Sequence, residues 1–184
     1  LELKDIPIAV TVARHWPELA TKSTTSLVES LETKIQDRKH YFEYEGGGNV
    51  STLNELFRSH KNKLSWDAKM KVSETAASRS PSKLYLEKYS SISVRDAVMA
   101  LIVKSANDVA TVIAEHIAGT ERDFAKLMTK YAKQIGMNKT TFKNASGLPN
   151  RAQLTTARDM ATLSYFLIRN FPEEYKLFKK ERFV

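Results

Sequence analysis

The stretch that decides the organisation of this chain is Val103-Lys104-Ser105-Ala106-Asn107-Asp108-Val109-Ala110. An apolar run ends at Ser105, and a second run with helical periodicity begins just after Asn107. At a junction between two helices, both side chains can point into the same cleft. The serine hydroxyl can relay a proton, and the asparagine amide can hold a substrate carbonyl or a lysine. The pair also fits a second interpretation, in which both residues simply form a helix N-cap.

The helices on either side are marked by their first residues. Ser93 and Asp96 have capping-box spacing, with Asp in place of Glu, and open a helix that ends at the junction. The helix after the junction reaches about Ile117 and is closed by Gly119. Further helices are predicted after Thr120 and Thr156, and a last turn begins at Pro172. Four members of the first helix share one side with Val94. They are Ala97, Val98, Leu101 and Ile102.

The segments before this helical region are less regular. Lys69-Met70-Lys71-Val72 alternates like a short strand, and Ser73 to Ser82 is polar and predicts a loop. A helix is expected after Ser51, over residues 53–57. Residues 51–184 are therefore predicted to form one mainly α lobe with little strand content.

Residues 1–50 are predicted to be a separate N-terminal segment of unknown origin. It has a β-prone run over residues 6–12, a helical pattern from Pro17 and three glycines at residues 46–48. The glycines suggest a joint, an engineered junction or a loop that needs positive φ. The chain opens Leu1-Glu2-Leu3-Lys4, without the features of a signal peptide. An exported mature chain, a trimmed chain and a cytosolic protein all remain open.

Composition narrows the chemistry. The 184 residues include no cysteine, which excludes disulfides, thiolate metal sites and cysteine nucleophiles. We predict no cofactor and no metal, because no cluster of His, Asp or Glu has ligand spacing. The net charge of +8 suggests an anionic polymer such as nucleic acid or an acidic cell wall. No arginine cluster is interleaved with aromatics, so nucleic acid ranks well behind.

A long set of segments resembles the serine-type D-alanyl-D-alanine carboxypeptidases, the low-molecular-mass penicillin-binding proteins. The resemblance covers about residues 51–184 and does not include residues 1–45. Its segments follow one another with the family's spacing. They include Lys63-Leu64-Ser65, Ser80-Pro81-Ser82-Lys83-Leu84, Ser93-Val94-Arg95-Asp96-Ala97, Lys104-Ser105-Ala106-Asn107-Asp108, Ala114-Glu115-His116-Ile117-Ala118-Gly119, Gly147-Leu148-Pro149 and Thr156-Ala157-Arg158-Asp159-Met160-Ala161.

The resemblance implies the helical lobe of a penicillin-binding-protein fold, which is α+β as a whole. It also implies that Ser105 and Asn107 are the catalytic Ser-x-Asn pair. The family's substrate is the peptidoglycan stem peptide, and β-lactams acylate the same nucleophilic serine. The implied location is the periplasm or cell envelope, and membrane contact is implied by the resemblance alone.

The family's other two motifs are not where they are expected. Ser-x-x-Lys should fall within Glu45-Gly46-Gly47-Gly48-Asn49, which holds neither a serine nor a lysine, and Lys-Thr-Gly should lie beyond residue 184. One literal Ser-x-x-Lys exists, at Ser80-Pro81-Ser82-Lys83. We interpret it as a loop, since Pro81 and the serines disfavour the helical turn that the motif needs. The chain is therefore expected to be incomplete or inactive as a carboxypeptidase.

The alternative is a non-catalytic or engineered chimeric module built on the helical lobe. A lobe that normally covers a sheet would expose an apolar face without it. Residues 1–45 are then expected to cover that face, or the chain to self-associate.

Overall fold

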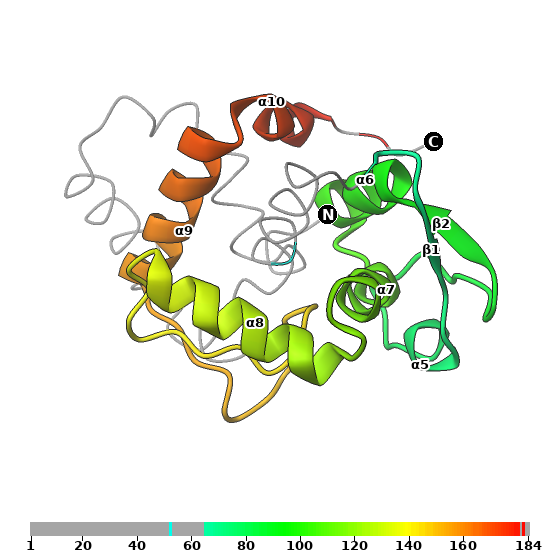
Figure 1. Cartoon of the computed structure of the whole chain (residues 1–184), viewed down its shortest axis with the longest axis horizontal. Helices are drawn as coiled ribbons and strands as arrows, with labels where there is room; N and C mark the ends of the chain where they lie inside the picture. Colours follow the sequence, from blue (N-terminus) through cyan, green and yellow to red (C-terminus); the bar gives the residue numbers. More distant parts are fainter. Residues whose placement is uncertain (1–51, 53–64, 181, 183–184) are drawn as a thin grey trace.

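The computed structural model describes Thr52, residues 65–180 and Arg182. Figure 1 shows a mainly helical body with a small antiparallel ribbon at one edge. Its helices are α5 (Glu74–Ala77), α6 (Val94–Lys104), α7 (Asn107–Ala118), α8 (Glu121–Gln134), α9 (Ala157–Asn170), α10 (Pro172–Tyr175) and the 3₁₀ turn η2 (Lys176–Lys179). The mainly α prediction for this part of the chain is confirmed. The strand, helix and joint predicted within residues 1–50, and the helix over 53–57, lie outside the described residues.

The ribbon pairs β1 (Lys69–Lys71) with β2 (Ser91–Ser93), with Met70 opposite Ile92. Both of these residues are buried, while Lys69 and Lys71 face solvent. The predicted strand at residues 69–72 is therefore confirmed. Its partner was not predicted, because a three-residue segment with two serines has little β-propensity of its own and pairs only through tertiary contact.

The stretch from Ser73 to Ser82 was predicted as loop, and this is wrong for its first part. Residues 74–77 form the one-turn helix α5. The Ser73 hydroxyl oxygen accepts a hydrogen bond from the Ala76 amide at 2.9 Å, and Ala76 is completely buried. A good N-cap followed by two alanines supplies the turn, and packing against α7 stabilises it.

Three helices begin with the predicted pairing of a hydroxyl residue and an aspartate three positions later. In each pair the hydroxyl oxygen accepts a hydrogen bond from the aspartate's own amide. The pairs are Ser93–Asp96 at 3.0 Å, Thr120–Asp123 at 3.0 Å and Thr156–Asp159 at 3.1 Å. Each cap stabilises its helix by about 1 kcal/mol. These local signals explain why the starts of α6, α8 and α9 could be predicted correctly.

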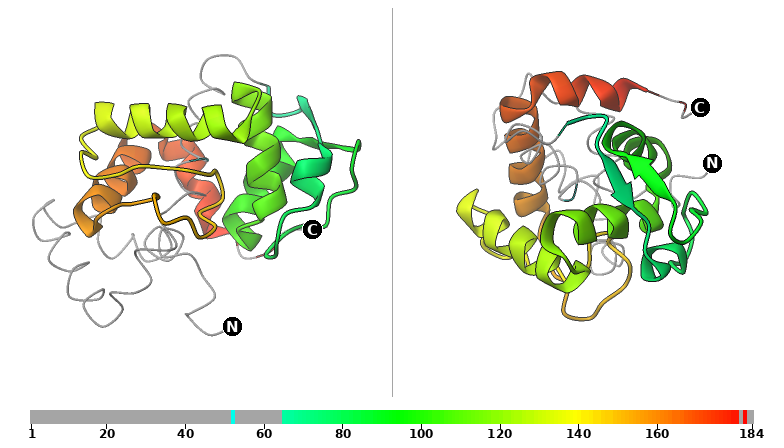
Figure 2. Two further views of the ribbon diagram at one scale, coloured as in Figure 1. Left: turned by 90° about the horizontal axis from the view of Figure 1, so that it is seen from below. Right: turned by 45° about the vertical axis from the view of Figure 1, so that its right-hand side comes forward.

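The helices pack around α7. Helices α5, α6 and α8 and strand β1 all contact it, while η2 returns to pack on α6 after α9 and α10. Figure 1 shows α9 on the far side of the molecule from the ribbon, while α10 leads back toward α6, and Figure 2 gives two further views of the same arrangement. The core joins apolar side chains from every layer. Its largest completely or almost completely buried members are Met70, Leu101, Ile102, Ile113, Phe124, Met128, Met137 and Leu163. The predicted apolar side of α6, from Val94 to Ile102, thus faces the core.

Candidate functional site

The predicted site lies at the junction of α6 and α7. Ser105 is the C-cap of α6 and adopts a left-handed conformation, with φ 53° and ψ 44°. Its amide donates to the Leu101 carbonyl at 3.1 Å and closes the helix. Left-handed backbone costs a non-glycine residue about 1 to 2 kcal/mol, so the surrounding structure must hold it there. Such strain at a polar residue is common at functional sites.

Asn107 is the first residue of α7 and is nearly buried. Its Nδ2 donates to the Ser80 carbonyl at 2.9 Å, and its backbone amide donates to the Ser82 carbonyl at 2.8 Å. Because only the NH₂ group can donate to a carbonyl, this contact fixes the orientation of the side-chain amide. The side-chain oxygen Oδ1 is left as the acceptor that this residue offers.

The interpretation of Ser105 and Asn107 as an N-cap pair is wrong. The N-cap of α7 is Ala106, which makes no side-chain cap hydrogen bond. The two residues instead belong to different elements, one ending α6 and the other beginning α7. Ala106 alone separates the two residues in the chain, and the junction lies next to the loop that contains Ser80.

Asp108 fastens the same loop to α7. This aspartate is completely buried. Its Oδ1 accepts hydrogen bonds from the amides of Leu84 at 3.0 Å and Val109 at 2.9 Å, and its Oδ2 accepts from Leu86 at 3.1 Å. A buried carboxylate is tolerated where several N–H donors surround it. The first turn of α7 therefore positions residues 80–86 through side chains at two successive positions.

A second polar cluster supports the junction from behind and consists of Arg79, Thr111, Glu121 and Ala145. Arg79 pairs with Glu121 through Nη2, and its Nε donates to Thr111 Oγ1 at 2.9 Å. Glu121 Oε1 accepts the buried Ala145 amide at 3.1 Å. Thr111 Oγ1 in turn donates to the Asn107 carbonyl at 3.2 Å. This cluster links the Ser80 loop, α7, the start of α8 and the loop that follows Phe142.

The literal Ser-x-x-Lys at residues 80–83 forms no helix, so the expectation of a loop is confirmed. The Lys83 ammonium donates to the Ala77 carbonyl at 3.1 Å and lies 5.1 Å from the ring centre of Tyr85. Ser82 Oγ donates to the Lys104 carbonyl at 2.9 Å. The lysine thus stabilises the loop, and the rejection of Ser80 as a nucleophile stays a prediction.

Sequence reasoning singled out Ser105 and Asn107, whose catalytic role stays a prediction, and it missed the residues that hold them. An aspartate directly after the asparagine in an amphipathic helix was a possible signal, since an acidic residue on the buried side needs partners. Arg79 and Glu121 carried no local signal, because they meet only in the folded chain. The segment expected to hold the nucleophile, Glu45 to Asn49, lies outside the described residues.

Among the described residues, no group of three or more His, Asp or Glu side chains is placed to hold a metal ion. None of the helices formed by residues 65–180 has the length and hydropathy needed to cross a membrane.

Comparison with known proteins places this junction in a family. The D-alanyl-D-alanine carboxypeptidase family matches residues 55–184. D-alanyl-D-alanine carboxypeptidase DacA of Haemophilus influenzae is 39% identical over 103 residues, which are 56% of this chain and 26% of the relative. DacC of Escherichia coli is 39% identical over 108 residues, or 59% of this chain and 27% of the relative. The chain thus spans about a quarter of the length of these curated relatives.

Solved structures agree. The carboxypeptidase DacD from Francisella tularensis superposes with a TM-score of 0.67 at 42% identity, over 71% of this chain and 32% of that one. Penicillin-binding protein D2 from Listeria monocytogenes, in its ampicillin-bound form, has a TM-score of 0.59 at 34% identity, over 68% of this chain and 51% of that one. The fold is therefore the helical lobe of a low-molecular-mass penicillin-binding protein. This chain belongs to the D-alanyl-D-alanine carboxypeptidase family.

Proposed function

We propose that this chain carries the Ser-x-Asn part of a D-alanyl-D-alanine carboxypeptidase site in peptidoglycan metabolism, with Ser105 as the proton relay and Asn107 as the substrate clamp. The observation that supports it most is the left-handed turn at Ser105, two residues before an asparagine whose side-chain amide is fixed by the Ser80 carbonyl. This turn lies in the family's matched region. The peptidoglycan stem peptide and β-lactams are the proposed ligands, and the periplasm or cell envelope is the proposed location.

The proposed chemistry is acyl transfer. A serine nucleophile would attack the terminal amide, a neighbouring base would take its proton, and water would release the acyl group. A hydroxyl such as that of Ser105 passes protons between base and leaving amine, while the Asn107 carboxamide holds the substrate backbone. The 184 residues contain no Lys-Thr-Gly and have glycines where the nucleophile is expected. We therefore propose that this polypeptide alone does not become acylated.

Fluorescent penicillin tests the second half of this proposal. The full chain should show no labelled band after denaturing electrophoresis, while penicillin-binding protein D2 from Listeria monocytogenes, whose structure is known in an ampicillin-bound form, serves as the positive control. A covalent adduct on this chain would refute the proposed inactivity, and mapping that adduct to Ser80 would also overturn our interpretation of the loop at residues 80–83.

A transplant tests the first half. Residues 65–180 would replace the matching segment of the Escherichia coli DacC protein, which supplies the remaining motifs. The chimera should be labelled by fluorescent penicillin, and Ser105→Ala or Asn107→Ala should lower its labelling rate by about a hundredfold. Ser80→Ala is the matched control and should leave the rate within about twofold. A folded chimera whose labelling is unaffected by Ser105→Ala would exclude the proposed role.

The second candidate function is a non-catalytic or chimeric module, favoured by the missing motifs in the sequence. It predicts that the transplanted lobe folds but gives an unlabelled chimera. Its companion expectation concerns the apolar face left without a sheet. Size-exclusion chromatography should show self-association, or proteolytic removal of residues 1–45 should unfold the lobe. A monomer that keeps its helical signal after that removal would contradict both.

A further inference from the structure

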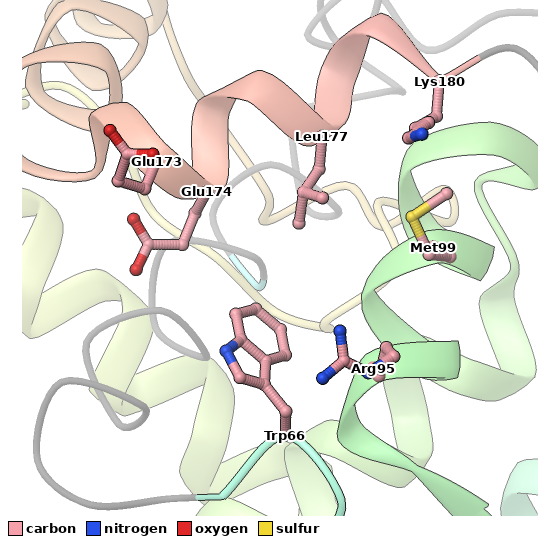
Figure 3. Close-up of a pocket in the computed structure, with 7 residues that line it drawn as sticks. All are labelled: Trp66, Arg95, Met99, Glu173, Glu174, Leu177 and Lys180. Atoms are coloured by element: carbon pink, nitrogen blue, oxygen red, sulfur yellow. The ribbon is translucent and has the colours of Figure 1, made fainter.

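A slot of about 500 Å³ lies between the start of α6 and the α10–η2 segment, away from the Ser105 junction. Figure 3 shows its residues, with Trp66 at the base, Arg95 beside it and the residues of α10 and η2 opposite. The base is well anchored, since the Arg95 amide donates to the Trp66 carbonyl at 2.9 Å. The Arg95 guanidinium lies 5.8 Å from the Trp66 ring centre. This volume is in the range of small-molecule sites.

One acidic side chain in the slot, that of Glu174, has no polar partner among residues 65–180. Glu174 is only 9% exposed, and its carboxylate has no hydrogen bond or ion pair with any residue among 65–180. Figure 3 shows that the Glu174 side chain extends from α10 on the side of the slot that faces Trp66, with its carboxylate turned away from Arg95. Its neighbour Glu173 differs, because it is exposed and both of its oxygens are bonded to Lys176, at 2.8 and 2.7 Å. Glu174 is largely buried and its carboxylate is unpaired among residues 65–180, so a cation that enters the slot can form a charge-assisted hydrogen bond with it.

The charges in the slot are separated. The two glutamates lie at one end, while Arg95 and Lys180 lie toward the other. Leu177 supplies apolar surface between the two ends, and Met99 lies at the basic end beside Lys180. Asp67 approaches Arg95 only at 3.9 Å, and both side chains are largely exposed. This ion pair is therefore weak, and the Arg95 guanidinium can still bind a ligand. The arrangement suits a molecule with opposite charges at its two ends and hydrocarbon in the middle.

We propose that this slot binds an extended zwitterion, in which a short hydrocarbon chain separates a primary ammonium from a carboxylate, as at a carboxy-terminal lysine. The ammonium bonds to Glu174, the chain lies along Leu177 over the indole of Trp66, and the carboxylate faces Arg95 and Lys180. This proposal is independent of the function proposed for Ser105.

Tryptophan emission gives a direct assay. The chain has two tryptophans, so Trp16→Phe leaves Trp66 as the single reporter in the full-length protein. The probe is 6-aminohexanoate, with hexylamine as the cation-only ligand and hexanoate as the anion-only ligand. We expect saturable binding of 6-aminohexanoate with Kd of about 1 mM, weaker binding of hexylamine and none of hexanoate. Binding of hexanoate as strong as that of 6-aminohexanoate, or no saturation by 6-aminohexanoate, would overturn the proposal.

Two substitutions locate the ligand's ends. Glu174→Gln should weaken both amine ligands by about tenfold or more, since a charged hydrogen bond becomes a neutral one. Glu74→Gln, at an exposed glutamate paired with Lys88 on the opposite edge, is the matched control and should change neither. Arg95→Gln should reduce the affinity for 6-aminohexanoate to that of hexylamine and leave hexylamine unchanged.

A second measurement separates binding from folding. Without ligand, Glu174→Gln should leave the thermal midpoint within a few degrees, because Gln keeps the size of the side chain and the carboxylate has no partner among residues 65–180 to lose. A lower midpoint together with unchanged ligand affinity would show that Glu174 is structural and would refute the site.

Discussion

Replacing Glu121 with alanine should destabilise the fold far more than replacing an exposed glutamate. The substitution removes the partner of Arg79 and the acceptor of the Ala145 amide. Ala145 is completely buried, and a buried N–H without an acceptor costs about 1 to 3 kcal/mol. The side chains of Arg79 and Glu121 are 28% and 14% exposed, so solvent screens their pair only in part. Breaking it adds about 1 to 2 kcal/mol.

The expected total is about 3 kcal/mol in the free energy of unfolding. Urea denaturation followed by helical circular dichroism measures it. Glu74→Ala is the matched control, because Glu74 pairs with Lys88 at 3.2 Å but both side chains are more than half exposed. That substitution should cost about 0.5 kcal/mol. Glu121→Gln, which keeps an acceptor for Ala145 and loses the charge, should fall between them. If Glu121→Ala and Glu74→Ala differ by less than about 1 kcal/mol, the cluster does not support the junction.

Three further substitutions have defined outcomes. Asn107→Asp should lower the free energy of unfolding more than Asn107→Ala does, by about 2 against 1 kcal/mol in urea titration, because a carboxylate cannot donate to the Ser80 carbonyl. Tyr89→Gly should raise the free energy of unfolding by about 0.5 kcal/mol, since Tyr89 has φ 68° and is 74% exposed, while Tyr165→Gly in α9 should lower it. Burial raises the pKa of Tyr175 to about 12, from 10.0. The stability that this shift contributes is complete below pH 10 and is lost as the pH rises toward 12. Between pH 9.5 and 12, Tyr175→Phe should therefore lose about 1 to 2 kcal/mol less of its free energy of unfolding than the parent chain, as measured by paired urea titrations.

The parts of the fold that could be predicted are those with local causes. Ser93, Thr120 and Thr156 each place a hydroxyl before an aspartate, and each begins a helix as expected. The errors have the opposite origin. Strand β2 exists because Ile92 is buried opposite Met70, and α5 persists because Ala76 is buried. Neither contact is visible in a window of a few residues, where serines dominate and favour a loop.

The candidate site also combines features that have a local sequence signal with features that depend on tertiary contacts. Ser105 and Asn107 could be proposed as site residues because two helices meet there and because the surrounding segments resemble a family. The backbone that makes the pair special could not be found, since a left-handed serine has no sequence signature of its own. Asp108 is the clearest case. Its carboxylate accepts from residues more than twenty positions earlier, so its role follows from the tertiary fold.

The contacts that hold the junction suggest that it is prepared before any ligand arrives. Asn107, Asp108 and Thr111 all project from the first turns of α7, and all three bond to the segment 79–84. None of these contacts involves Glu45 to Asn49 or a Lys-Thr-Gly strand. A chain that lacks a nucleophile at the expected position would therefore still present Asn107 in its fixed orientation. For this reason the transplant into an active relative tests the junction itself, whereas labelling of the chain alone tests only whether the remaining parts are present.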